Sequence, residues 1–168
     1  GESDTRYTLN GLLLHFIPKK NNIELKVVGT DGHRLSVIAV NLEGKISEEK
    51  KMILPKKAAI ELKKLIEGIS ENVTIYIDKN HIFFSTDDIT LTSRLIEGTY
   101  PNYEQVIPKN NEKKVVIDKM TFLKALRRTS IMSRERTNAV RFDLEAGKVT
   151  LISMNPDVGE AREEIAAQ

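Results

Sequence analysis

The sequence lacks cysteine and tryptophan, and aromatic residues make up only 5% of its 168 residues. Without cysteine, neither a disulfide framework nor a cysteine-ligated zinc site can form. No run of about 18 apolar residues occurs, which excludes a transmembrane helix within this sequence. The first residues, GESDTRY, carry neither the basic start nor the apolar core of a signal peptide. We therefore expect a cytoplasmic protein.

The composition is that of an ordinary globular protein. Charged residues make up 30% and hydrophobic residues 40% of the chain, a balance that argues against disorder. The formal net charge is only +2, so overall charge does not single out a nucleic-acid-binding protein. A polar stretch at residues 108–114 has no apolar period, and we expect it to link two domains, residues 1–107 and 108–168.

One pattern recurs three times along the chain. An alternating apolar strand ends at a polar corner and another strand follows; the copies begin at Asn22, Asn80 and Gly147. A further strand and a hairpin turn precede each copy. Residues 52–68 and 114–131 each predict a short strand and then a helix, which begins near Pro55 or Asp118. The pattern predicts an α+β fold of β-α-β-β-β units, the first of which has no strand and helix of its own.

The two predicted helices are amphipathic. Their apolar positions are Ala58, Leu62, Leu65 and Ile66 in the first helix and Phe122, Leu123 and Leu126 in the second. The other sides carry Lys56, Lys57, Lys63 and Lys64, and Lys124, Arg127 and Arg128. These cations form either a solvated face or a set of contacts to nucleic-acid phosphates. Because no aromatic residue lies among them, the second interpretation favours duplex DNA bound without sequence preference.

The turn in GTDGHRLSV, residues 29–37, places His33 and Arg34 between two apolar runs. The matching corner of the second copy has Asp87 and Asp88 but no His-Arg pair, so the acidic residue is typical of turn geometry. An arginine beside the apolar Leu35 suits the rim and floor of a shallow groove that binds a peptide. The corner therefore predicts a docking surface.

Enzymatic chemistry is an alternative interpretation. A hydrolase or nucleotidyltransferase could use Asp31 and His33 together with the Asp87-Asp88 pair. The three histidines, however, lie on different predicted elements and show no metal-ligand spacing, and no phosphate-binding glycine loop occurs. We expect no catalytic residue, no metal and no cofactor. An open DNA-binding module is a third possibility, which predicts tight, salt-sensitive binding to linear duplex.

Six blocks of the sequence, together and in this order, resemble the bacterial DNA polymerase III beta subunit family, the sliding clamps. The blocks are DTRYTLNGLLL, VVGTDGHRLSV, LPKKAAIELKKLIEG, SRLIEGTYPNYEQVIP, FLKALRRTSIMSRERTNAVRF and NPDVGEAREE. The resemblance covers essentially the whole chain. It implies a DNA clamp fold, in which helices line the inner face of a head-to-tail dimeric ring and antiparallel sheets form the outside.

The resemblance also implies where this chain belongs in such a ring. Residues 1–107 would be most of the middle domain without its first strand and helix, and residues 108–168 the N-terminal half of the third domain. The chain has no initial methionine, so we expect a fragment. Because the family's ring closes between a first and a third domain, this chain alone is not expected to close one.

The residues that match the family's functional positions form three groups. Those of the partner-peptide-binding pocket are Leu9, Thr30, Gly32, His33, Arg34, Leu35, Pro101, Gln105, Val106 and Asn155. DNA contacts are expected from Arg6, Tyr7 and the helix cations named above. Ile131 and Met132 resemble the third-domain side of the dimer interface.

The function that the resemblance implies is processivity without catalysis. A ring holds its polymerase on DNA by topology, so its inner contacts need only be weak and indifferent to sequence. The expected partners are duplex DNA and short peptide motifs of the DNA polymerase III alpha subunit, the clamp loader and repair polymerases. These motifs would compete for one apolar groove.

Overall fold

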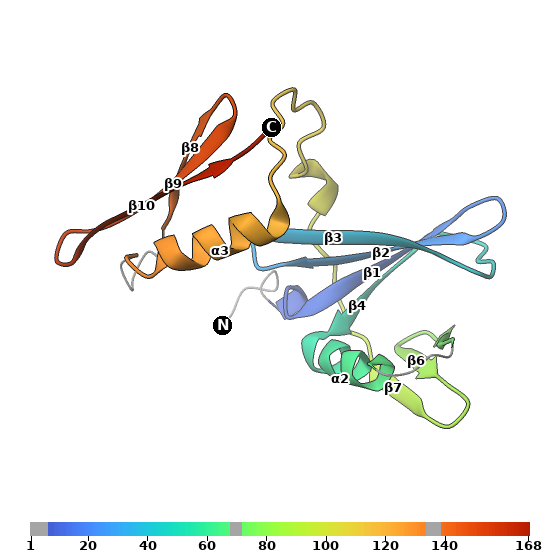
Figure 1. Cartoon of the computed structure of the whole chain (residues 1–168). Coiled ribbons are helices and arrows are strands. Elements are labelled where there is room, and N and C mark those ends of the chain that lie inside the picture. The colour runs from blue at the N-terminus through green and yellow to red at the C-terminus, as the bar shows by residue number, and fades with distance from the viewer. Residues whose placement is uncertain (1–6, 68–71, 134–138) are drawn as a thin grey trace. The chain divides into compact units, whose positions relative to one another are not determined.

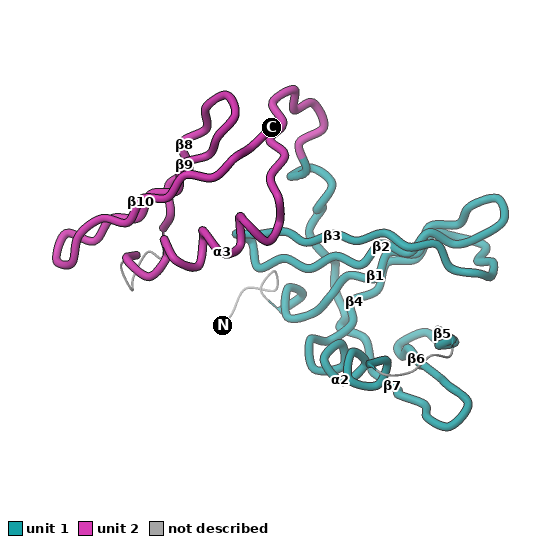
Figure 2. The backbone as a smooth tube through the Cα atoms, in the orientation of Figure 1, with its two compact units in different colours: residues 1–107 teal, residues 108–168 magenta. Residues whose placement is uncertain are grey.

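The computed structural model describes residues 7–67, 72–133 and 139–168. The chain divides into two compact units, residues 1–107 (unit 1) and residues 108–168 (unit 2), coloured separately in Figure 2. Each unit has its own hydrophobic core. In the parts of the chain that the structure describes, no helix is both long and apolar enough to cross a membrane.

Unit 1 contains two antiparallel sheets and the helix α2 (Figure 1). The four-stranded sheet has the order β3-β2-β1-β4, and the three-stranded sheet has the order β5-β6-β7. In the larger sheet, Leu14 of β1 lies opposite Val27 of β2 on one side and Met52 of β4 on the other. The element bounds are β1 (Gly11–Pro18), β2 (Ile23–Thr30), β3 (Leu35–Leu42), β4 (Lys50–Pro55), α2 (Lys56–Ile66), β5 (Thr74–Ile77), β6 (His81–Ser85), β7 (Thr90–Arg94) and the short 3-10 turn η1 (Tyr103–Gln105).

Helix α2 begins directly after Pro55, as the sequence predicts. Proline is favoured at a helix start because its φ is already fixed near the helical value and its missing N–H has no partner to lose there. Ala58 and Leu62 pack against the core of unit 1, but the predicted core residue Ile66 is 44% exposed. It is the last residue of the helix, and the apolar stripe no longer faces the sheets there.

Strand β1 of the four-stranded sheet is buried on both faces, whereas the edge strand β3 is mostly exposed. Successive side chains of a strand point to opposite sides, so Leu13 and Leu14 belong to different clusters. The cluster on the α2 side consists of Leu14, Phe16, Ile23, Leu25, Leu54, Ile82 and Phe84. The cluster on the other side consists of Leu13, Val28, Ile53, Tyr100 and Tyr103, so the segment after β7 covers that face.

Unit 2 packs the helix α3 (Lys119–Ser130) on a three-stranded antiparallel sheet of order β10-β9-β8. The strands are β8 (Arg141–Glu145), β9 (Lys148–Asn155) and β10 (Gly159–Ala166). Asp118 caps the helix as predicted, because its Oδ1 accepts hydrogen bonds from the Thr121 backbone N–H at 2.8 Å and hydroxyl at 2.7 Å. The core comprises Ala125, Val149, Leu151 and Ile165, with Phe122 and Leu126 packed against it; Leu123, predicted to face inward, is not part of this core.

Within the described residues, one copy of the repeat is complete: β4, α2, β5, β6 and β7 form a full β-α-β-β-β unit. Before β1, the described residues include helical positions at 7–8 and no strand. The strand predicted before α3 is wrong, because residues 114–118 form no strand. Val116 pairs with Gln168 through two backbone hydrogen bonds, and its side chain is 66% exposed.

Candidate functional site

The corner between β2 and β3 is held by its own hydrogen bonds. The Thr30 hydroxyl donates to the Arg34 carbonyl at 2.7 Å and accepts from the Gly32 N–H at 3.1 Å. Gly32 has a φ of 87°, a left-handed conformation that favours glycine. Residues 31–34 are all exposed, so the corner is open to a partner.

Asp31 organises this corner through both carboxylate oxygens. Oδ1 accepts from the backbone N–H groups of His33 and Arg34, each at 3.0 Å, and Oδ2 accepts from Arg34 Nε at 3.0 Å. The two backbone donors, followed by the guanidinium, lower the pKa of Asp31 from its ordinary 3.8 to about 2. Asp31 therefore shapes the turn and orients Arg34.

A titration of Asp31 checks this geometry. Because the folded pKa is lowered, the stabilisation from ionised Asp31 is present above pH 3.8 and is lost as the pH falls through about 2. An NMR titration of the side-chain carboxyl is expected to show a midpoint near 2. In Arg34→Ala the midpoint should rise but stay below the ordinary value, since the backbone donors remain. A midpoint at 3.8 in the unaltered chain would contradict the hydrogen-bonded corner.

A notch of about 320 Å³ lies beside the corner. One side is the corner itself, and the other is the segment that carries η1, where the Asn102 side chain caps the turn by accepting from the Glu104 N–H at 3.2 Å. Leu35 is half-buried against the cluster that includes Leu13, whereas Val106 is 67% exposed. The lining residues are Leu9, Thr30, Gly32, His33, Arg34, Leu35, Pro101, Asn102, Tyr103 and Val106.

The structure places eight of the ten predicted pocket residues around this notch. Gln105 lies in η1 but not among the lining residues, and Asn155 ends β9 in the other unit. The sequence prediction missed Asn102 and Tyr103. Their only sequence signal was their position between the predicted residues Pro101 and Val106.

The corner has no catalytic arrangement. Asp31 binds the backbone of His33, not its imidazole, and the remaining Asp31 oxygen is taken by Arg34. Asp87 and Asp88 lie at the corner between β6 and β7 of the other sheet. Among the described residues, no group of three His, Cys, Asp or Glu side chains is placed to hold a metal ion.

The predicted DNA-contacting cations of both helices are exposed. Several of them have acidic partners: Lys63 pairs with Glu67 at 3.3 Å, and Lys64 with Glu61 at 3.0 Å. Arg128 of α3 forms a two-bond ion pair with Glu163 of β10. Exposed pairs of this kind are weak, so a phosphate can compete for the lysines, whereas Arg128 is more firmly held.

Four further residues were predicted to contact DNA or a second subunit. Arg6 lies outside the described residues. Tyr7 is 58% exposed at the start of unit 1. In unit 2, Ile131 directly follows α3 and is 78% exposed, while Met132 is half-buried.

The described residues form an α+β repeat architecture with an open notch beside the corner between β2 and β3. Residues 1–102 match the family described as DNA polymerase III beta subunit, central domain, and residues 104–168 match its C-terminal domain. The chain belongs to the DNA polymerase III beta subunit family, the sliding clamps.

Individual relatives agree with this assignment. The chain is 36% identical to a beta sliding clamp of Pseudomonas putida; the match covers 98% of this chain and 44% of the relative. It is 35% identical to a beta sliding clamp of Staphylococcus aureus, with 98% of this chain and 43% of the relative covered. All of this chain superposes on the crystal structure of the Pseudomonas aeruginosa DNA polymerase III subunit beta, with a TM-score of 0.90, 33% identity and 45% of that chain covered. A sliding clamp from Bartonella birtlesii bound to griselimycin gives a TM-score of 0.89 at 36% identity. The chain thus spans less than half the length of the relatives it matches.

Proposed function

We propose that this chain carries the partner-docking surface of a bacterial sliding clamp, a processivity factor without catalysis. The notch beside the His33-Arg34 corner is the observation that carries the proposal. An exposed arginine and apolar side chains line a volume of about 320 Å³, which suits a short peptide segment. The DNA polymerase III alpha subunit, the clamp loader and repair polymerases are the proposed sources of that segment.

The rest of the chain fits a clamp that surrounds duplex DNA in the cytoplasm. Residues 1–107 are proposed as most of the middle clamp domain and residues 108–168 as the N-terminal half of the third. The exposed cations of α2 and α3, together with Arg6 and Tyr7, would contact phosphates without reading sequence. The strongly exposed Ile131, with Met132 beside it, is proposed as part of the interface of a homodimeric ring formed by the full-length protein.

A peptide titration tests the proposal. A fluorescein-labelled peptide with a clamp-binding motif of a bacterial polymerase III alpha subunit is expected to bind this chain saturably, as measured by fluorescence anisotropy. A version of the chain extended to full clamp length should bind it more tightly, because residues beyond this chain are expected to complete the pocket.

The control is a scrambled peptide of the same composition. Equal anisotropy changes with both peptides would reject the notch as a specific docking site. Hydrolysis or nucleotidyl transfer that is lost in His33→Ala would favour the enzymatic alternative.

A further inference from the structure

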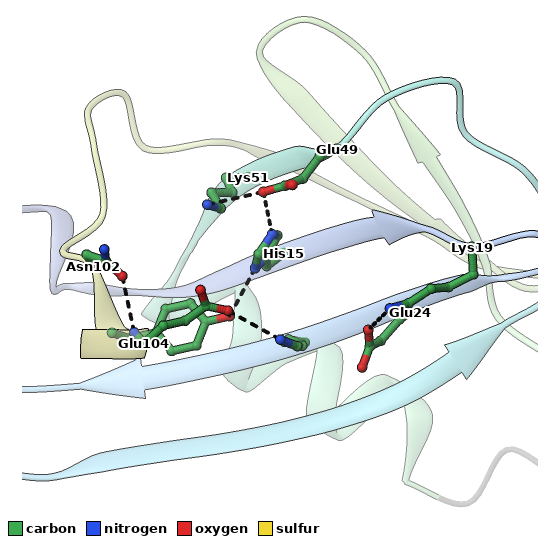
Figure 3. Close-up of polar contacts among 9 residues, drawn as sticks. His15, Lys19, Glu24, Glu49, Lys51, Asn102 and Glu104 are labelled. Atoms are coloured by element: carbon green, nitrogen blue, oxygen red, sulfur yellow. Dashed lines mark hydrogen bonds and ion pairs between the residues drawn. The ribbon is translucent and has the colours of Figure 1, made fainter. Parts of the chain in front are cut away.

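A series of hydrogen-bonded side chains, Glu49, His15 and Tyr103, leads from the β4 edge of the four-stranded sheet to the notch. His15 of β1 is only 3% exposed, and it lies between Glu49 and the η1 turn (Figure 3). Its Nε2 is 2.7 Å from Glu49 Oε1, and its Nδ1 is 3.0 Å from the hydroxyl of Tyr103. Tyr103 lines the notch, whereas His15 and Glu49 do not.

The direction of the two hydrogen bonds follows from the chemistry of Glu49. Its hydrogen bonds from His15 and then from Lys51 lower the pKa of Glu49, so this carboxylate is ionised at neutral pH and can only accept. The proton of neutral His15 therefore sits on Nε2, and Nδ1 is left as an acceptor. Burial first, and then Glu104, raises the pKa of Tyr103 to about 12, so its hydroxyl stays protonated. That single proton has two acceptors within reach, His15 Nδ1 at 3.0 Å and Glu104 Oε1 at 3.4 Å, and we assign it to the nearer one.

The other polar contacts between the segment that carries η1 and the sheet are weaker. Lys26 of β2 reaches Glu104 at 3.3 Å, but the Glu104 side chain is 50% exposed, and exposed ion pairs contribute little. Tyr100, just before the turn, donates to the Val28 carbonyl over a long 3.4 Å. The bond between His15 and Tyr103 is shorter and buried, where the loss of a partner is most costly.

We propose that His15 and Glu49 are positioning residues for the notch. Glu49 fixes the tautomer and orientation of His15, and His15 fixes Tyr103 and, through it, the turn that forms one wall. The inference rests on the proposed function, since it holds that His15 and Glu49 affect peptide binding although neither side chain contacts the peptide.

The main test is Glu49→Ala, which changes a half-exposed side chain outside the notch. It is expected to weaken peptide binding about three- to tenfold, the change in an equilibrium constant that one buried hydrogen bond produces. Tyr103→Phe, which keeps the ring, should weaken binding by a similar factor. Both should speed amide hydrogen exchange at Glu104 and Val106, whose N–H groups are bonded within the turn.

The matched control is Glu24→Ala. Glu24 of β2 is also a glutamate with a short ion pair, but that pair, to Lys19 at 2.8 Å, does not involve η1 (Figure 3). It should leave both the affinity and the exchange of the turn unchanged. Nitrogen-15 NMR of the imidazole adds a direct readout, with neutral His15 expected in the Nε2–H form in the unaltered chain and in mixed tautomers in Glu49→Ala.

The outcomes separate this inference from the proposed function. The inference is overturned if Glu49→Ala and Tyr103→Phe bind the peptide as the unaltered chain does, while a His33→Ala, Arg34→Ala variant loses binding. If the double variant also binds the peptide normally, the proposed docking function is rejected. The inference is then decided by two measurements that need no peptide: amide exchange at η1 and the tautomer of His15. Unchanged exchange and unchanged tautomer in Glu49→Ala would then overturn it.

Discussion

Leu54→Ala is expected to lower the free energy of unfolding of unit 1 by about 2–5 kcal/mol. Leu54 is 1% exposed and lies in the cluster between the two sheets and α2. Truncation to alanine removes apolar contacts and leaves a cavity that the rigid strands around it cannot close. A loss of this size is a large part of the stability of a small unit.

Tyrosine fluorescence measures this effect in unit 1 alone. The chain has no tryptophan, and its four tyrosines, Tyr7, Tyr76, Tyr100 and Tyr103, all lie in residues 1–107. Urea unfolding followed by tyrosine emission should therefore report on unit 1, and the midpoint should fall in Leu54→Ala with little change in slope.

Ile60→Ala is the matched control for Leu54→Ala. Ile60 is a branched aliphatic residue of α2 that is 45% exposed, so its truncation should change the stability by no more than about 0.5 kcal/mol. If the two variants unfold at the same urea concentration, Leu54 does not occupy the core position described.

The second large effect is expected in peptide binding. Replacement of both His33 and Arg34 with alanine should lower the affinity for the clamp-binding peptide about tenfold or more. Arginine at the edge of an apolar notch is typical of the residues that dominate binding energy. Fluorescence anisotropy measures the loss. Both side chains are exposed, so the unfolding midpoint should stay nearly the same.

Arg94→Ala controls for the loss of an exposed arginine. Arg94 pairs with Glu97 at 3.1 Å, three residues away, much as Arg34 pairs with Asp31 at 3.0 Å, but Arg94 does not line the notch. It should bind the peptide as the unaltered chain does. Equal weakening by the double variant and by Arg94→Ala would show a general effect of charge and no docking at the corner.

Features set by neighbouring residues were predictable from the sequence. The cap at Asp118, the helix start after Pro55 and the turn at Gly32 each depend on local backbone preferences. The strand expected at residues 114–118 does not form, because a strand also needs a partner that is distant in the sequence. Apolar residues such as Val115 and Val116 predict a strand only where a partner strand pairs with them, and only Gln168 does so here.

Contacts between distant residues could not be predicted in this way. Tyr103 lies 88 positions from His15, and Glu49 lies 34 positions from it. Nothing in the spacing of the three histidines distinguishes His15 as the buried one, because its strand is buried on both faces and therefore shows no alternation. The roles of the notch residues came from the family resemblance, and Asn102 and Tyr103 emerge only from the fold.

The hydrogen-bonded corner at Asp31 has a consequence for how fast and how tightly a partner binds. A loop that has to be ordered on binding subtracts that conformational entropy from the affinity. Asp31 and Thr30 already fix the backbone from Thr30 to Arg34. Under the proposed docking function, a peptide would therefore meet a preorganised rim and lose mainly its own conformational freedom. The residence time of each proposed partner peptide would then be set mainly by the side chains that it inserts into the notch.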